Sequence, residues 1–171
     1  MVEAVAVLLM QAALVYAALR DLVSYQIPNW LTLAIAADFL AAALAGPTVL
    51  SDIGWHLSAG VAVLAACALL FWRGMIGGGD AKLLAACAVW AGWSGIVPFI
   101  LAVSVLGGVL TVLIVIFRRV ELTGRWAGRE WIRRLHSGEK GVPYGVAIGL
   151  GGLVTLGGVL DPGAAGWGAL W

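Results

Sequence analysis

A chain of 171 residues in which 63% are hydrophobic and only 11% are charged is far more apolar than an ordinary soluble domain. Its mean hydropathy of +1.03 excludes the soluble globular class and predicts an integral membrane protein. With a formal net charge of +1, we expect the lipid bilayer as a partner and no nucleic acid.

Five apolar runs follow one another along the chain, each near the ~20 residues with which a helix crosses ~30 Å of hydrocarbon. They cover residues 2–19, 30–45, 55–72, 96–117 and 142–160. The first run contains Glu3 where a signal peptide has a basic segment, and no small-residue cleavage site follows it. We therefore expect it to remain as the first span. A sixth run, residues 83–92, is too short to assign by length alone.

The basic residues predict the topology. Seven of the ten Lys and Arg residues lie in the segment 118–140, and the other three are Arg20, Arg73 and Lys82. Under the positive-inside rule the connections that carry them are cytoplasmic, and both chain ends lie outside the cytoplasm. A single crossing over residues 81–117 would put the basic segment outside, so the short run is predicted to be a span of its own.

We therefore expect an all-α integral membrane protein with six transmembrane helices in a single domain, residues 1–171. The spans are expected over about 2–19, 30–45, 55–72, 81–92, 96–117 and 142–160. The segment 118–140 is interpreted as a bent interfacial segment held to anionic lipid by its arginines. It makes a poor amphipathic helix, because Trp126 faces away from Trp131 and Leu135 on a helical wheel.

Two aspartates are predicted to lie on the cytoplasmic face. Asp21 follows the first span, and Asp80 lies between the third and the fourth. Two carboxylates that meet can share one proton, because like charges a few ångströms apart cannot both ionise at low cost. The ionised acid can then draw a proton from water while the protonated acid activates a carbonyl, as in aspartic proteases. This chemistry needs no metal or other cofactor, and neither His56 nor His136 has a catalytic triad around it.

Three glycines precede Asp80 in the stretch GMIGGGDAKLL, residues 74–84. A backbone without Cβ can adopt a positive φ and let a substrate strand or a neighbouring helix approach the acid closely. The alternative is a glycine-rich helix start with Asp80 as its N-cap. Asp80 alone leaves both interpretations open.

Three segments together resemble a known family. They are RDLVSYQIPNWLTL (residues 20–33), GMIGGGDAKLL (74–84) and GVPYGVAIG (141–149). In this order they resemble the motifs of the prepilin peptidases, which are GxGD-type intramembrane aspartic proteases, and the likeness covers nearly the whole chain. The small size and the P-Y-G segment are most similar to the short form that serves tight-adherence (Flp) pili.

The resemblance implies that Asp21 and Asp80 are the catalytic pair, and that Gly77 and Gly79 complete the GxGD signature. It also implies an endopeptidase of the inner (cytoplasmic) membrane that cuts a prepilin between its basic leader and its apolar helix. The freed pilin could then enter a pilus assembly machinery. The precursor is left open among Flp-type pilin, other type IV pilin, secretion pseudopilin and archaellin-like protein.

Three further residues match the family motifs. Pro28 and Asn29 match the I-P-N element, which reads as a proline-fixed turn with Asn29 capping the second span. Lys82 matches the motif's lysine and could stabilise a substrate carboxylate or anchor its helix among the headgroups. Larger members carry a cytoplasmic insert with paired cysteines and also N-methylate the pilin. Because this chain has no such insert, we expect no methyltransferase activity.

Asp38 is not explained by these motifs. It lies roughly 13 Å along the second span, where an acid is either a protonated packing group or part of a cavity. The alternative function is a small proton- or cation-coupled transporter that uses Asp38 and Asp80. Such a protein usually shows internal repeats or paired broken helices, and the sequence shows neither.

The remaining candidates are interpreted mainly as packing residues. Gly141, Gly145 and Gly149 repeat at the spacing that lets helix backbones touch. Tyr144, between two of them, could line the site with its hydroxyl. Cys67 and Cys87 each lie alone in an apolar run and are assigned no chemistry.

Overall fold

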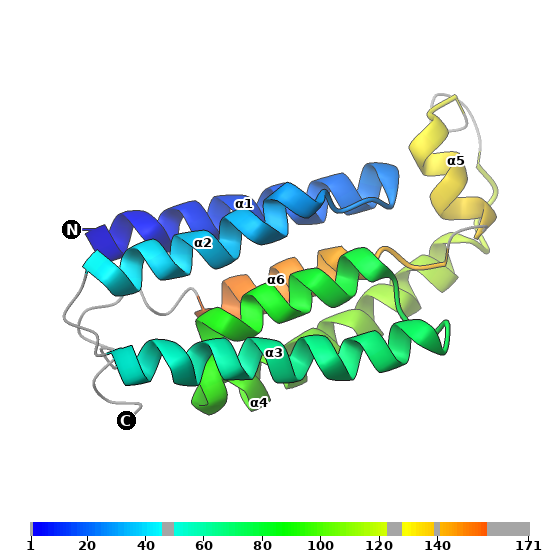
Figure 1. Cartoon of the computed structure of the whole chain (residues 1–171). Helices are drawn as coiled ribbons and strands as arrows, with labels where there is room; N and C mark the ends of the chain where they lie inside the picture. The colour runs from blue at the N-terminus through cyan, green and yellow to red at the C-terminus, as the bar shows by residue number, and fades with distance from the viewer. Residues whose placement is uncertain (1, 46–49, 123–127, 139–140, 157–171) are drawn as a thin grey trace.

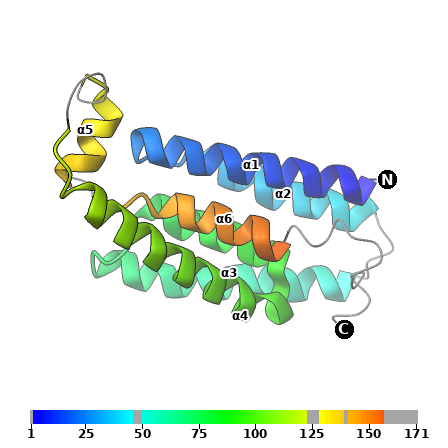
Figure 2. The same ribbon diagram turned by 180° about the vertical axis from the view of Figure 1, so that it is seen from behind.

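The computed structural model describes residues 2–45, 50–122, 128–138 and 141–156. Within these ranges the chain is all-helical: α1 (Val2–Ser24), α2 (Asn29–Ala45), α3 (Leu50–Trp72), α4 (Gly78–Phe117), α5 (Glu130–Ser137) and α6 (Tyr144–Leu156). All except α5 run roughly parallel or antiparallel in one bundle (Figures 1 and 2). The predicted all-α class is confirmed.

Three described helical segments are long and apolar enough to cross a membrane: Ala4–Ser24, Asp52–Trp72 and Gly78–Phe117. α2 and α6 are shorter apolar helices. The predicted span over residues 142–160 begins two residues before α6, and residues 157–160 lie outside the described part of the chain.

α4 is one long element with a sharp bend at Gly92, whose φ of 61° and ψ of −176° are not helical. A Cβ there would lie 2.7 Å from Cε1 of His56. Glycine suits this position because it tolerates the positive φ and leaves room for the His56 ring. The ribbon reverses at this bend, giving a first arm (78–91) and a second arm (93–117) (Figures 1 and 2). The bend falls at the end of the predicted short span over residues 81–92.

The basic segment contains a helix, which corrects the expectation of a poor amphipathic segment. α5 buries Ile132 and exposes Glu130, which pairs with Arg134 one turn later. The Arg134 guanidinium lowers the pKa of Glu130. Gly128 precedes this helix and Gly138 ends it in the left-handed region, so a glycine lies at each end of α5. Trp126, on which the expectation rested, lies outside the described residues.

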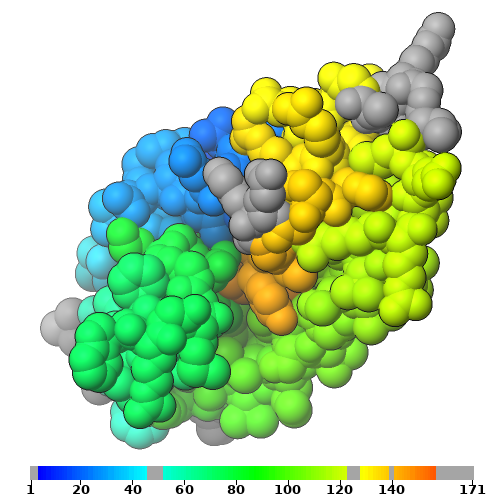
Figure 3. Space-filling model, turned by 90° about the vertical axis from the view of Figure 1, so that its right-hand side faces the viewer, coloured from blue at the N-terminus to red at the C-terminus, as the bar shows by residue number. Residues whose placement is uncertain are grey.

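Arg118 attaches α5 to the bundle. Its Nε donates to the Leu135 carbonyl at 2.9 Å, and its Nη2 donates to the Gly141 carbonyl at 2.6 Å. α5 therefore projects from the end of the bundle where α1 ends and α6 begins (Figures 1 and 3).

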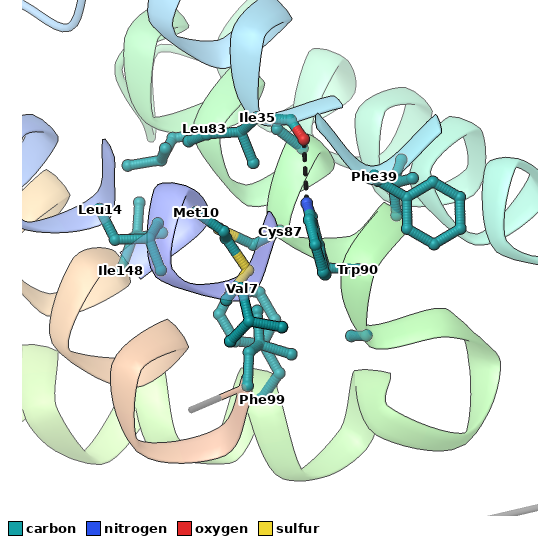
Figure 4. Close-up of a cluster of buried hydrophobic side chains, with 14 of the residues drawn as sticks. Val7, Met10, Leu14, Ile35, Phe39, Leu83, Cys87, Trp90, Phe99 and Ile148 are labelled. Atoms are coloured by element: carbon teal, nitrogen blue, oxygen red, sulfur yellow. Dashed lines mark hydrogen bonds between the residues drawn. The ribbon is translucent and has the colours of Figure 1, made fainter. Parts of the chain in front are cut away.

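One apolar core joins the helices. Its buried side chains come from α1, α2, α3, both arms of α4 and α6, and include Met10, Leu14, Ile35, Leu83, Cys87, Phe99 and Ile148 (Figure 4). The indole N–H of Trp90 donates to the Ile35 carbonyl at 2.9 Å, which satisfies the polar group of a buried aromatic ring. This packing fixes where the polar helix ends lie relative to one another.

Candidate active site

Asp21 and Asp80, 59 positions apart in the chain, line one cavity at the end of the bundle that carries α5. The cavity has a volume of about 450 Å³, and its other lining residues are Arg20, residues 25–29 and residues 77–79. The charges of the two carboxylates interact. The pair that the sequence predicted on one face is thus brought together in one site, which we call the aspartate cavity. In Figure 3 the segments around it come from the blue and green parts of the chain, beside the orange start of α6.

Asp80 lies in the first turn of α4. Gly77 is the N-cap, with φ −74° and ψ 145°, so Asp80 is the third helical residue and not the cap that the alternative interpretation required. The Gly77 N–H donates to the Asp80 carboxylate. An acid at this position commonly returns a bond to the N-cap backbone, and the positive end of the helix dipole also favours a negative charge there.

The glycines act through space and not through an unusual backbone. Neither Gly77 nor Gly79 has a positive φ, so that part of the sequence expectation is wrong. A Cβ on Gly77 would lie 2.8 Å from Oδ2 of Asp80, and one on Gly79 would lie 3.3 Å from Cβ of Ile27. The close approach at Gly79 is therefore to the I-P-N turn of the same chain.

These contacts predict different effects of two alanine substitutions. Gly77→Ala should displace the Asp80 carboxylate and lower cleavage by about 10-fold or more, because small misplacements of a reacting group are costly. Gly79→Ala meets a side chain at 3.3 Å and should cost less. Rates per folded molecule in detergent would test this, and a Gly79→Ala variant slower than Gly77→Ala would contradict it.

Asp21 is held from the opposite side of the cavity. It is only 5% exposed, and its Oδ2 accepts a hydrogen bond from the Gly145 N–H at 2.7 Å. That donor lies at the start of α6, where helix N–H groups lack partners within the helix and suit an anion. The repeat of glycines indicated packing alone, so this contact was missed by sequence reasoning.

The glycine repeat combines two roles. A Cβ on Gly145 would lie 2.8 Å from Oδ2 of Asp21, whereas one on Gly149 would lie 2.9 Å from the Leu14 carbonyl oxygen. Packing of α6 on α1 is therefore confirmed at these two positions. Gly141 lies before α6 with a φ of 79°, so its expected part in helix packing is wrong.

The I-P-N turn and the lysine meet beside the aspartates. Pro28 precedes α2, which begins at Asn29. The Asn29 Oδ1, expected to cap this helix, accepts a hydrogen bond from Lys82 Nζ at 2.8 Å. Pro28 and Asn29 line the aspartate cavity. The bond ties the start of α2 to the start of α4.

Tyr25 is a cavity residue that sequence reasoning did not single out. It follows the last residue of α1 with a φ of 55°, a conformation that costs a residue with Cβ about 1–2 kcal/mol. Burial raises the pKa of its phenol, the Arg118 guanidinium opposes this shift, and the Asp21 charge adds to it. Its hydroxyl oxygen is buried without a hydrogen-bond partner among the described residues. No sequence pattern marks such a backbone.

Two predicted candidates lie elsewhere. Tyr144 is 45% exposed and packs against Gly107 on the second arm of α4, outside the lining of the aspartate cavity. Asp38, on α2, also does not line it, and its Oδ2 is buried without a hydrogen-bond partner in the described part of the chain. Asp38 and Asp80 therefore do not form the joint site that a transporter would use.

His56 and the two cysteines are buried in the bundle, whereas His136 on α5 is partly exposed, with its Nε2 2.9 Å from the Val120 carbonyl oxygen. His56 is 3% exposed, its Nδ1 lies 2.8 Å from the Val89 carbonyl oxygen, and its ring stacks on Phe39. Cys67 and Cys87 are both buried and free. In the described ranges, no group of three or more His, Cys, Asp or Glu residues could hold a metal ion.

One of three comparisons with known proteins finds a match. The model of the type IV leader peptidase family matches residues 8–112, which is more than half of the chain. The matched segment includes both aspartates and the I-P-N turn, and it ends in the second arm of α4. No curated protein and no solved structure matches the chain.

Proposed function

The chain belongs to the type IV leader peptidase family, and from that premise we propose that it is a membrane aspartic endopeptidase that removes the basic leader from a prepilin. The observation that carries this proposal is the aspartate cavity, in which two carboxylates from different helices interact. The family match alone does not identify the catalytic residues. We assign that role to the paired carboxylates of Asp21 and Asp80.

The pair can divide the work of hydrolysis. With one proton between them, the ionised acid takes a proton from a water molecule as it attacks the scissile carbonyl. The protonated acid donates its proton to the carbonyl oxygen, which gives a tetrahedral gem-diol. The first acid then passes the proton that it took from water to the leaving amine, and the second acid recovers a proton from a gem-diol hydroxyl as the C–N bond breaks. The hydrogen bonds from Gly145 to Asp21 and from Gly77 to Asp80 hold both carboxylates in place while this happens.

The membrane arrangement is part of the proposal. Counting the two arms of α4 separately gives six crossings, with the aspartate cavity, Arg118 and α5 at the cytoplasmic end. The support is the concentration of seven basic residues in the segment 118–140 together with the reversal at Gly92. This end of the bundle is where the basic leader of a prepilin would meet its apolar helix.

The topology predicts the outcome of reporter fusions. A reporter inserted within residues 121–135 should report the cytoplasm, and one placed after Asp161 should report the opposite side. Paired alkaline phosphatase and fluorescent-protein fusions measure this directly. Both reporters on the same side would contradict the last crossing and the inferred position of the termini.

The proposed substrate is an Flp-type prepilin, and we propose that no N-methylation follows cleavage. The support is the P-Y-G segment at residues 143–145 and the connection between α1 and α2, which spans only residues 25–28. Such a connection leaves no room for the cytoplasmic insert that two-activity members carry.

Co-expression with a panel of precursors tests this function. An Flp-type prepilin, another type IV prepilin and a pseudopilin would each be expressed with the enzyme, and the mass of the mature N-terminus recorded. We expect cleavage of the Flp-type precursor without an added methyl group. Failure to cleave any of the three would reject the function, and preference for another precursor would reject only the assignment to Flp pili.

A further inference from the structure

α2 and α3 follow one another in the chain but barely touch, since each packs against α4. The space between them is a groove of about 500 Å³, which we call the lateral groove. Its walls include Leu33 and Ala36 of α2 and Val61 and Leu64 of α3, and its floor includes Ala85 and Ala86 of α4.

The lateral groove lies next to the aspartate cavity. Asn29 lines both, and Lys82, which donates to Asn29, lies at the same end of the groove and two residues after Asp80. Away from this polar end the lining is almost wholly apolar. The groove therefore leads from the two acids into a region that suits only a hydrocarbon-like occupant.

Its dimensions suit a helix. From Lys82 to Val89 the floor extends about 10 Å, which is about two turns of an α-helix. The small side chains of Ala85 and Ala86 would let another backbone approach closely. Within the described part of the chain the walls are uncovered, since Leu33 is 69% and Val61 is 66% exposed.

We propose that the lateral groove binds the first turns of the apolar helix of the substrate, directly after the bond that is cut; this inference rests on the proposed function. A substrate whose scissile bond lies between the aspartates can continue past Asn29, which lines both the cavity and the groove. A lipid chain would meet the same apolar walls but has no reason to adjoin two acids.

Charge at the groove entrance supports a substrate orientation in which the apolar helix lies in the groove and the basic leader lies outside it. The Lys82 ammonium, which lines the groove at this end, repels a basic leader. The leader is thereby kept out of the groove, and only the apolar side of the junction can enter. The groove thus sets which side of the scissile bond faces the membrane.

Two valines of nearly equal exposure provide a matched test. Val61 lines the groove and is 66% exposed, whereas Val105, on the second arm of α4, is 65% exposed and lies outside the groove. A photo-crosslinking residue at position 61 of the Asp80→Asn enzyme should capture the full-length prepilin through its apolar helix. The same residue at position 105 should capture it at background level.

Kinetics on the active enzyme complete the test. Val61→Trp should raise KM for a full-length prepilin about 10-fold or more, and Val105→Trp should leave it unchanged. Equal crosslinking at both positions, or unchanged KM in Val61→Trp with an active wild type, would overturn the groove and leave the proposed function standing. A wild type that cleaves no prepilin would reject the proposed function, and with it this occupant.

Discussion

Asp21→Asn and Asp80→Asn should each lower the rate of prepilin cleavage by about 10³-fold or more, since an amide cannot exchange the proton that the mechanism requires. The side chains keep their size, and the Gly145 N–H can still donate to the remaining oxygen at position 21. The measurement is cleavage per folded molecule by purified enzyme in detergent, normalised to the monodisperse peak.

Asp38→Asn is the matched control. Asp38 is also an acid in an apolar helix, but it lies outside the aspartate cavity, so its amide variant should keep near-normal turnover. If either Asp21→Asn or Asp80→Asn retained a tenth of wild-type activity, that residue would be removed from the proposed mechanism.

Gly145→Ala should be the most damaging substitution that leaves both acids in place. The added methyl group would lie 2.8 Å from Oδ2 of Asp21 and 2.9 Å from its Cβ, so either the carboxylate or α6 must move. A displacement of about 1 Å can cost about 100-fold in rate. We expect a loss of that order in kcat for a helix that still folds, measured as turnover per folded molecule.

Two other glycines separate a catalytic effect from loss of stability. Gly149→Ala meets the Leu14 carbonyl at 2.9 Å, away from the acids, and should lower the thermal midpoint without lowering turnover of the folded enzyme. Gly108→Ala meets nothing within 4 Å and should change neither. If Gly145→Ala behaved like Gly149→Ala, the bond to Asp21 would be structural only.

The shared location of the two aspartates was predictable from the number of predicted spans between them and from the positions of the basic residues. Once the basic residues place the connections, Asp21 and Asp80 must lie at the same end of the bundle, and the helical structure agrees. The break between the arms of α4 was predictable for the same reason, since the charge rule requires a reversal before Arg118.

The supporting contacts were not predictable from spacing. The i+4 repeat that includes Gly145 indicates helix contact but not which group the glycine faces, and here that group is a carboxylate instead of an alkyl side chain. The positions of Tyr25 and Gly77 in the site similarly depend on the backbone conformation of the turns that contain them. The helix α5 was missed because Trp126 was included in its pattern, although the described helix begins at Glu130.

Mass spectrometry can test directly whether the two aspartates catalyse cleavage without a metal. Purified enzyme would cut an Flp-type prepilin with a metal chelator present, and the masses of both fragments would be recorded. We expect two fragments whose masses sum to that of the precursor plus one water, with the cut between the basic leader and the apolar helix. An intact precursor, a cut elsewhere, or cleavage suppressed by the chelator would contradict a metal-independent pair of aspartates as the catalytic centre.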